Sequence, residues 1–147
     1  MPLPPPPQRF LLVDGHSIIY AWEELKKLHL TGNKRYLARE ALLAKMRLLQ
    51  DMSGESVVVV FDGNQAKMTD EREAGGIQIF YADAGHTADS IIERLAAKYA
   101  GTYSLRICTA DGMIWETVTA LGAAWISPKD LRTELERSEK EMRKRLK

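Results

Sequence analysis

Four aspartates of this sequence occupy positions from which their side chains could meet. Asp14, Asp62 and Asp111 each lie at or just beyond the end of a short apolar segment. Asp89 lies at the start of an amphipathic segment, and Glu93 follows one helical turn later on the same face. Carboxylates brought together repel one another, and hard divalent cations such as Mg²⁺ or Mn²⁺ relieve that repulsion through oxygen ligands. The pattern predicts a shared cation site, where a pair of ions could activate water for phosphodiester hydrolysis.

Each of these residues also has a purely structural interpretation. Asp14 and Asp62 each precede a glycine, and Asp-Gly is a common turn sequence. Asp89 could complement the N-terminus of a helix, and Asp111 could cap the next one. Singly, the structural interpretation is the stronger one for each residue. Because three strand ends carry the same residue type, the shared cation site is favoured for the set.

The segments that carry the aspartates alternate between two kinds of pattern. Short apolar runs rich in β-branched residues predict five strands, at Phe10–Val13, Val57–Phe61, Ile77–Tyr81, Ser104–Thr109 and Ala123–Ile126. Apolar residues spaced by three and four predict helices, at Ile18–Leu28, Lys34–Met52, His86–Tyr99, Met113–Leu121 and from Pro128 onward, and a long polar loop is expected over Gly63–Gly76. Thr87 is the expected N-cap of the helix at His86–Tyr99.

Buried strands alternating with helices indicate an α/β protein. We expect a three-layer α/β/α sandwich with a central parallel sheet of about five strands. In such sheets ligands bind beyond the carboxyl ends of the strands, which is where the aspartates lie.

The composition restricts the class of protein. The chain has 147 residues, 45% hydrophobic and 28% charged, which fits one folded domain and excludes a disordered chain. No apolar run approaches the length of a membrane-spanning helix, and the first residues lack the pattern of a secretory signal. Cys108 is the single cysteine, so no internal disulfide can form. We therefore expect a cytoplasmic protein without membrane contact.

Prolines and charges divide the chain into three parts. Five of the six prolines fall within residues 2–7, so residues 1–8 are expected to form a Pro-rich N-terminal tail, followed by a domain over 9–135 and a basic helix end over 136–147. The net charge of +1 conceals basic flanks, at residues 23–50 and 129–147, around an acidic remainder. Such flanks suit a protein that holds cations centrally and a polyanion at its rim. Charge alone favours the simpler interpretation, the solvated faces of amphipathic helices.

Four stretches carry a resemblance to a known family. LLVDGHSII (11–19), VVVVFDG (57–63), HTADSIIE (86–93) and ICTADG (107–112) resemble, in order and spacing, the YacP-like branch of the NYN family within the PIN-like nucleases, over about Arg9–Leu135. The resemblance implies a PIN-like fold and a metal-dependent endoribonuclease that binds Mg²⁺ or Mn²⁺ and acts on RNA, with association with the ribosome as one form of that partnership. We expect no organic cofactor, and a monomer.

The resemblance also suggests roles for individual residues. It implies that catalysis and metal binding belong to Asp14, Asp62, Asp89 and Asp111, and we expect substrate binding at Ser17, Arg39, Glu93 and Thr109. Two positions depart from the family pattern: Ser17 replaces the usual Asn, and Trp115 replaces a polar residue that is frequently Gln. A hydroxyl can still orient a carboxylate or cap a helix. Trp115 could stack on a base or pack against the sheet, and packing is the favoured use.

Two other functions are compatible with the same segments. A non-catalytic protein that binds RNA or the ribosome would keep the fold and the basic rim. A phosphoacceptor receiver domain would also place acids near Asp14 and Asp62, but it normally has adjacent acids after the first strand and Lys before Pro after the last. This chain has Asp14-Gly15 and Pro128-Lys129 instead, so the receiver interpretation ranks last.

Overall fold

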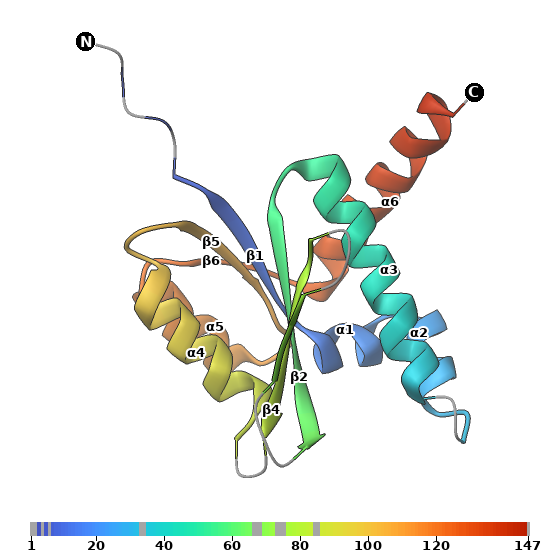
Figure 1. The fold of residues 1–147 in the computed structure, drawn as a ribbon, viewed down its shortest axis with the longest axis horizontal. Coiled ribbons are helices and arrows are strands. Elements are labelled where there is room, and N and C mark those ends of the chain that lie inside the picture. Colours follow the sequence, from blue (N-terminus) through green and yellow to red (C-terminus); the bar gives the residue numbers. More distant parts are fainter. Residues whose placement is uncertain are drawn as a thin grey trace.

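The sheet has five parallel strands, and their order brings the aspartate-bearing ones together (Figure 1). The computed structural model describes residues 3, 5, 7–32, 35–65, 69–72, 76–83 and 86–146, and the backbone alone at 35, 63–65, 69–72 and 83. The parallel strands are β1 (Arg9–Asp14), β2 (Ser56–Gln65), β4 (Gln78–Asp83), β5 (Ser104–Cys108) and β6 (Ala124–Ile126), in the spatial order β4-β2-β1-β5-β6. The predicted parallel α/β sheet is confirmed.

The segment expected to be one long polar loop, Gly63–Gly76, contains part of two strands instead. β2 continues to Gln65 through an irregularity in its register with β4. β3 (Thr69–Arg72) then pairs antiparallel with β4 at the edge of the sheet. Its sequence, TDER, has no apolar alternation, so periodicity gave no signal for a strand there. Residues 66–68 and 73–75 lie outside the described residues.

Six helices are described, and most begin where the sequence predicts. They are α1 (Gly15–Ala21), α2 (Glu23–His29), α3 (Arg35–Ser53), α4 (Ala88–Tyr99), α5 (Gly112–Ala120) and α6 (Pro128–Arg145). Thr87 is the N-cap of α4 and Pro128 takes the first turn of α6, as predicted. Lys34, the predicted start of α3, lies outside the described residues. None of the helices in the described part of the chain has the length and apolarity to cross a membrane.

One predicted helix, Ile18–Leu28, is wrong because it consists of two helices. The backbone of Trp22 is extended, with φ −99° and ψ 117°, and separates α1 from α2. The Trp22 indole is buried and its N–H donates to the carbonyl oxygen of Pro128 at 2.9 Å. This long-range contact fixes the bend at Trp22. The apolar residues keep their spacing of three and four on both sides of the bend. Periodicity therefore could not reveal the break.

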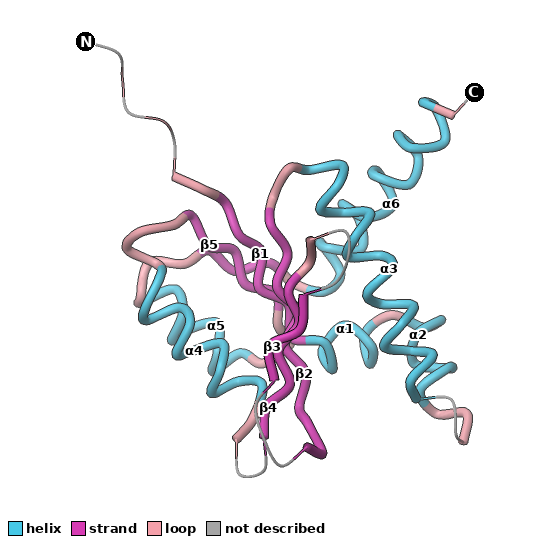
Figure 2. The backbone as a smooth tube through the Cα atoms, in the orientation of Figure 1, coloured by secondary structure: helices cyan, strands magenta, loops and turns pink. Residues whose placement is uncertain are grey.

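The helices cover both faces of the sheet, in two apolar layers. In Figures 1 and 2, α4 and α5 lie on one side of the strands and α1, α2, α3 and α6 on the other. Successive residues of β1 alternate between the layers, with Leu11 and Val13 in one cluster and Leu12 in the other. Because both faces are buried there, β1 and β2 each contain an unbroken apolar run, Phe10–Val13 and Val57–Phe61.

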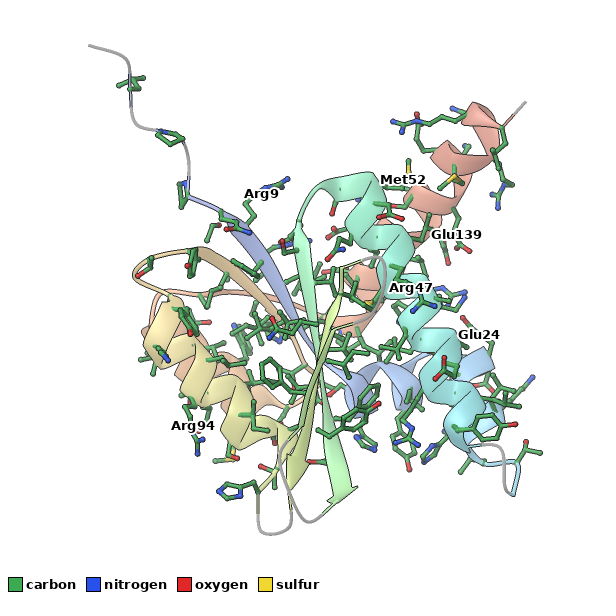
Figure 3. All side chains as sticks on the ribbon, in the orientation of Figure 1. Arg9, Glu24, Arg47, Met52, Arg94 and Glu139 are labelled. Atoms are coloured by element: carbon green, nitrogen blue, oxygen red, sulfur yellow. The ribbon has the colours of Figure 1, made fainter. Side chains whose placement is uncertain are left out.

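The basic end of α6 lies away from the aspartates. Leu135 is the last fully buried residue of this helix. Beyond it, Arg137, Lys140 and Lys144 line a hollow with Met52 at the end of α3, and Figure 3 shows Met52 and Glu139 at the same end of the molecule. α3 ends just before β2 begins, whereas Asp14, Asp62 and Asp111 lie near the other ends of their strands. The expectation that this basic segment forms a rim around the acidic centre is therefore not supported by the fold.

An ion-pair triad ties α6 to the sheet. Arg106 on β5 donates to Glu55 at 2.6 and 2.9 Å and to Glu134 of α6 at 2.8 and 3.0 Å. Glu55 is only 4% exposed, and the hydrogen bonds that Arg106 donates to both glutamates hold its pKa above the ordinary value. Arg106 therefore neutralises the buried carboxylate of Glu55.

Arg106→Leu should lower the free energy of unfolding by about 3 kcal/mol, since it leaves the buried Glu55 carboxylate uncompensated. Urea unfolding at pH 7.5 measures the loss. Arg145→Ala is the control, because Arg145 forms an exposed pair with Glu141 at 3.6 Å and such pairs contribute about 0–1 kcal/mol. Equal unfolding midpoints for the two variants would contradict the structural role of the triad.

Candidate active site

Asp14 lies at the junction between β1 and α1 and caps the helix. Its Oδ1 accepts hydrogen bonds from the backbone N–H groups of His16 at 3.2 Å and Ser17 at 3.5 Å. Asp14 is 7% exposed, and burial raises the pKa of its carboxylate above the ordinary value although the Ser17 hydrogen bonds oppose the shift. The Asp14-Gly15 pair is thus a strand-to-helix junction and not the turn that its sequence also allowed.

Two hydroxyls hold the other oxygen of this carboxylate. Ser17 Oγ donates to Asp14 Oδ2 at 3.0 Å, and Thr109 Oγ1 donates to the same oxygen at 3.5 Å. Ser17 Oγ also accepts from the backbone N–H of Ala110 at 3.0 Å, which joins α1 to the segment after β5. Thr109 is fully buried and its Oγ1 accepts from the N–H of Asp111 at 3.1 Å. In this chain the serine hydroxyl therefore orients the aspartate and links two strand ends.

Asp62 lies where β2 passes the edge of the apolar core. Its Oδ1 accepts from the backbone N–H of Ala88, the first residue of α4, at 2.6 Å. Its Oδ2 is 3.7 Å from Nδ1 of His16, and its side chain is 52% exposed. Asp62 therefore bridges the starts of α1 and α4 and still faces solvent.

Asp111 and Asp89 bring the remaining carboxylates to the same region. Asp111 is the N-cap of α5 and accepts from the N–H of Met113 at 2.9 Å, so its predicted capping role is real. Burial raises the pKa of Asp89 to about 6, assisted by the charges of Asp14 and Asp111, hydrogen bonding to Asp111 and the charge of Asp62. All three other aspartates thus contribute to the raised pKa of Asp89.

The donors in this region fit a hard divalent cation in kind. All four side chains offer oxygen, the ligand that Mg²⁺ and Mn²⁺ prefer. A cation would offset the burial and the neighbouring charges that together raise the pKa of Asp89. Within the described ranges, however, no three His, Cys, Asp or Glu side chains are already arranged as a metal-binding group. Coordination would require these carboxylates to turn toward a common point.

Two predicted substrate-binding residues lie outside this hydrogen-bonded set. Glu93 is partly buried on α4, one turn beyond Asp89, and is not hydrogen-bonded or ion-paired to the aspartates. Arg39 is partly buried on α3, with its guanidinium carbon 5.9 Å from the centre of the Tyr81 ring. Tyr81 stacks on Phe61, whose ring meets His16 edge-on. The contacts of Arg39 thus lead toward Asp62 through the rings of Tyr81, Phe61 and His16.

The surface beside Asp14 is hollow. A shallow depression of about 410 Å³ is lined by Asp14, His16, Ser17, Tyr20, Ala21 and Ala110. Another hollow, of about 300 Å³, lies between the sheet and α4 and is lined mainly by apolar and aromatic side chains without any aspartate. The depression at Asp14 is the one that a charged substrate could enter next to the carboxylates.

Sequence reasoning missed two contributors to this region. The backbone N–H of Ala88 carries no sequence signal, because every residue except proline has one. Trp125 on β6 donates its indole N–H to the carbonyl oxygen of Thr109 at 2.9 Å, and a single Trp in a short strand has no spacing that could indicate this contact.

Comparisons with known proteins agree on one family. The family model described as YacP-like NYN domain matches residues 11–147. The "Uncharacterized protein YacP" of Bacillus subtilis is 30% identical over 138 residues, which cover 92% of this chain and 80% of that protein.

Two solved structures of the Bacillus subtilis protein have the same fold. The crystal structure of Rae1 (YacP) superimposes with a TM-score of 0.78 at 28% identity, covering 95% of this chain and 80% of that one. Its W164L mutant has the same TM-score at 30% identity, covering 92% and 79%.

Proposed function

Because this chain belongs to the YacP-like NYN domain family, within the PIN-like nucleases, we propose that it is a metal-dependent endoribonuclease. Family membership implies a ribonuclease type of function, and such nucleases generally use divalent metals. The observation that carries the proposal is the set of hydrogen bonds that fixes Asp14 Oδ2 between the hydroxyls of Ser17 and Thr109, while Thr109 accepts from the N–H of Asp111. The pKa of Asp89, raised to about 6 by burial and by the charges of the other three aspartates, agrees with this arrangement. The proposed substrate is cytoplasmic RNA, free or on the ribosome.

The proposed mechanism gives the four aspartates one task. Asp14, Asp62, Asp89 and Asp111 would hold Mg²⁺ or Mn²⁺, which when bound lowers the pKa of water and offsets charge on the phosphate. Ser17 and Thr109 act as positioning residues, because their hydroxyls fix the direction of the Asp14 carboxylate. No side-chain nucleophile is required.

Substrate binding is assigned to residues beside this centre. Arg39 is proposed to bind an RNA phosphate, since a guanidinium provides several donors for phosphate oxygens. Glu93 is proposed to accept a hydrogen bond from a substrate hydroxyl. Ser17, which lines the depression at Asp14, and the buried Thr109, which acts through the Asp14 carboxylate, complete the proposed binding set.

The decisive experiment uses RNA without ends. A labelled circular RNA and a labelled structured RNA are incubated with Mg²⁺, Mn²⁺ or EDTA. An endonuclease opens the circle, whereas an exonuclease cannot. Cleavage with either metal and none in EDTA is expected. An RNA that stays intact with both metals but is retained by the protein would replace the proposal with a non-catalytic RNA-binding function.

Mn²⁺ should also raise the melting temperature, by about 9 °C at a hundredfold excess over its Kd, and more at pH 7.5 than at pH 5. Folding raises the pKa of Asp89 from 3.8 to about 6, so its ionisation destabilises the folded protein as the pH rises through this range. A bound cation removes that penalty, and protons displace the cation at lower pH. Identical melting curves with Mn²⁺ and EDTA at pH 7.5 would refute the cation site.

A further inference from the structure

Two tryptophans, one on the first turn of α5 and one on β6, stack on each other, and the first of them is exposed. Trp115 stacks on Trp125, with ring centroids 4.9 Å apart and an angle of 27° between the rings. Trp115 is 47% exposed and Trp125 is half-buried. The favoured use of Trp115, packing against the sheet, is therefore only partly correct: Trp125 supports one face of the ring, and much of Trp115 faces solvent.

The pair is fixed to the residues that surround Asp14. Trp125 donates to the carbonyl oxygen of Thr109 at 2.9 Å, and the Thr109 hydroxyl contacts Asp14 and the N–H of Asp111. Trp115 lies on the helical turn that Asp111 caps, since its backbone N–H donates to the Asp111 carbonyl oxygen at 3.2 Å. The two rings are thus held by the same segment that positions the carboxylates.

We propose that Trp115 is a stacking platform for one unpaired nucleobase of the RNA strand that runs through the aspartate site. This inference rests on the proposed function for the identity of its ligand. A nucleobase is favoured over a phosphate because Asp111 and Glu116 are neighbours of the ring in sequence and would repel an anion. A base is uncharged, and stacking on an aromatic face provides affinity where charge cannot.

The geometry favours stacking on a rigid surface. Trp125 packs on one face of the Trp115 ring, and a hydrogen bond from the Trp125 indole to Thr109 fixes Trp125 in turn. Little side-chain freedom of Trp115 is therefore lost when a base binds. Stacking does not depend on hydrogen-bond readout, so the platform should accept any base and prefer the larger purines. The Trp115 platform would hold the RNA strand beside the aspartates even when no cation is bound and the carboxylates do not attract the RNA phosphates.

Binding is measured in EDTA, so that cleavage does not enter the result. A short single-stranded RNA is titrated into the wild type and into Trp115→Phe, Trp115→Leu and Leu121→Ala, and fluorescence anisotropy gives the Kd. Leu121 is the matched control, because it is a large apolar residue just after α5 with 41% exposure and no ring. Trp115→Leu keeps an apolar side chain against Trp125 but removes the π face, and Trp115→Phe keeps a smaller one.

We expect Trp115→Leu to weaken binding about tenfold to a hundredfold, Trp115→Phe to retain most of the affinity, and Leu121→Ala to match the wild type. A series of RNAs, each with one abasic nucleotide at a different position, should contain one member that binds the wild type more weakly than the intact RNA does. Trp115→Leu should bind that member and the intact RNA with the same affinity. Melting temperatures identify a variant that fails to fold.

The outcomes separate this inference from the nuclease proposal. Unchanged affinity of a folded Trp115→Leu, or equal losses in Leu121→Ala, overturns the stacking platform even when the wild type cleaves RNA. Loss of affinity in Trp115→Leu combined with no cleavage by the wild type supports the platform and overturns the nuclease. Self-association that disappears in Trp115→Leu, with RNA affinity unchanged, would assign the surface to a second copy of the chain and overturn the inference.

Discussion

Asp14→Asn should abolish RNA cleavage and leave the protein folded. The substitution keeps the size of the side chain, and Asn is as good an N-cap as Asp, so α1 can still begin at Gly15. It removes the charge of the most buried of the four aspartates, which is 7% exposed. Losing a metal-binding carboxylate should lower the cleavage rate on the order of a hundredfold or more, since even residues that support such ligands contribute about 10–100-fold.

The same substitution should not lower stability in EDTA. Asp14 contributes to the charge that raises the pKa of Asp89, so neutral Asn relieves repulsion in the metal-free protein. Asp51→Asn serves as the control, because Asp51 is exposed near the end of α3 and away from the strand ends that carry the site. Rates and melting temperatures of both variants are compared with the wild type. Full activity in Asp14→Asn would show that the cleavage belongs to a contaminant or that the site is elsewhere.

The sequence is sufficient to predict a parallel sheet, the places of its strands along the chain and the residues at their ends. Apolar runs such as Val57–Phe61 are visible because both faces of the strand are buried, and Asp62 follows at the edge where burial ends. By contrast, the break at Trp22 depends on a hydrogen bond to Pro128, more than a hundred residues away. Local periodicity contains no information about such a partner.

The site was predictable in its residue types and less so in its contacts. That Asp14 and Asp111 come near one another follows from β1 and β5 being adjacent parallel strands. The use of Ser17 Oγ as a link to the Ala110 N–H, and of the Ala88 N–H as a donor to Asp62, depends on backbone groups that are alike at every position. The stack of Trp115 on Trp125 depends on where β6 lies beside α5, which spacing along the chain does not specify.

Gly15 also had a plausible but incorrect explanation at the sequence level. Asp-Gly often marks a turn that needs the left-handed conformation, but Gly15 does not have a positive φ and is the first residue of α1. Glycine is required at position 15 because there is no space for a Cβ atom. A Cβ built there would lie 2.5 Å from Cδ1 of Phe61 and closer still to Cε1. Phe61 is fully buried and stacked on Tyr81, so its ring has little room to move away.

Gly15→Ala should therefore lower the free energy of unfolding by about 2 kcal/mol, the usual cost of overpacking a core. Gly112→Ala is the matched control, since Gly112 follows Asp111 at the start of α5 as Gly15 follows Asp14, and a Cβ there meets nothing within 4 Å. It should be neutral or stabilising by up to about 1 kcal/mol, because alanine favours helix. Urea unfolding measures both variants, and cleavage of the circular RNA measures whether displacement of α1 also moves Asp14. If the Gly15 variant were as stable and active as the Gly112 variant, close packing between α1 and Phe61 would not be what positions the Asp14 carboxylate.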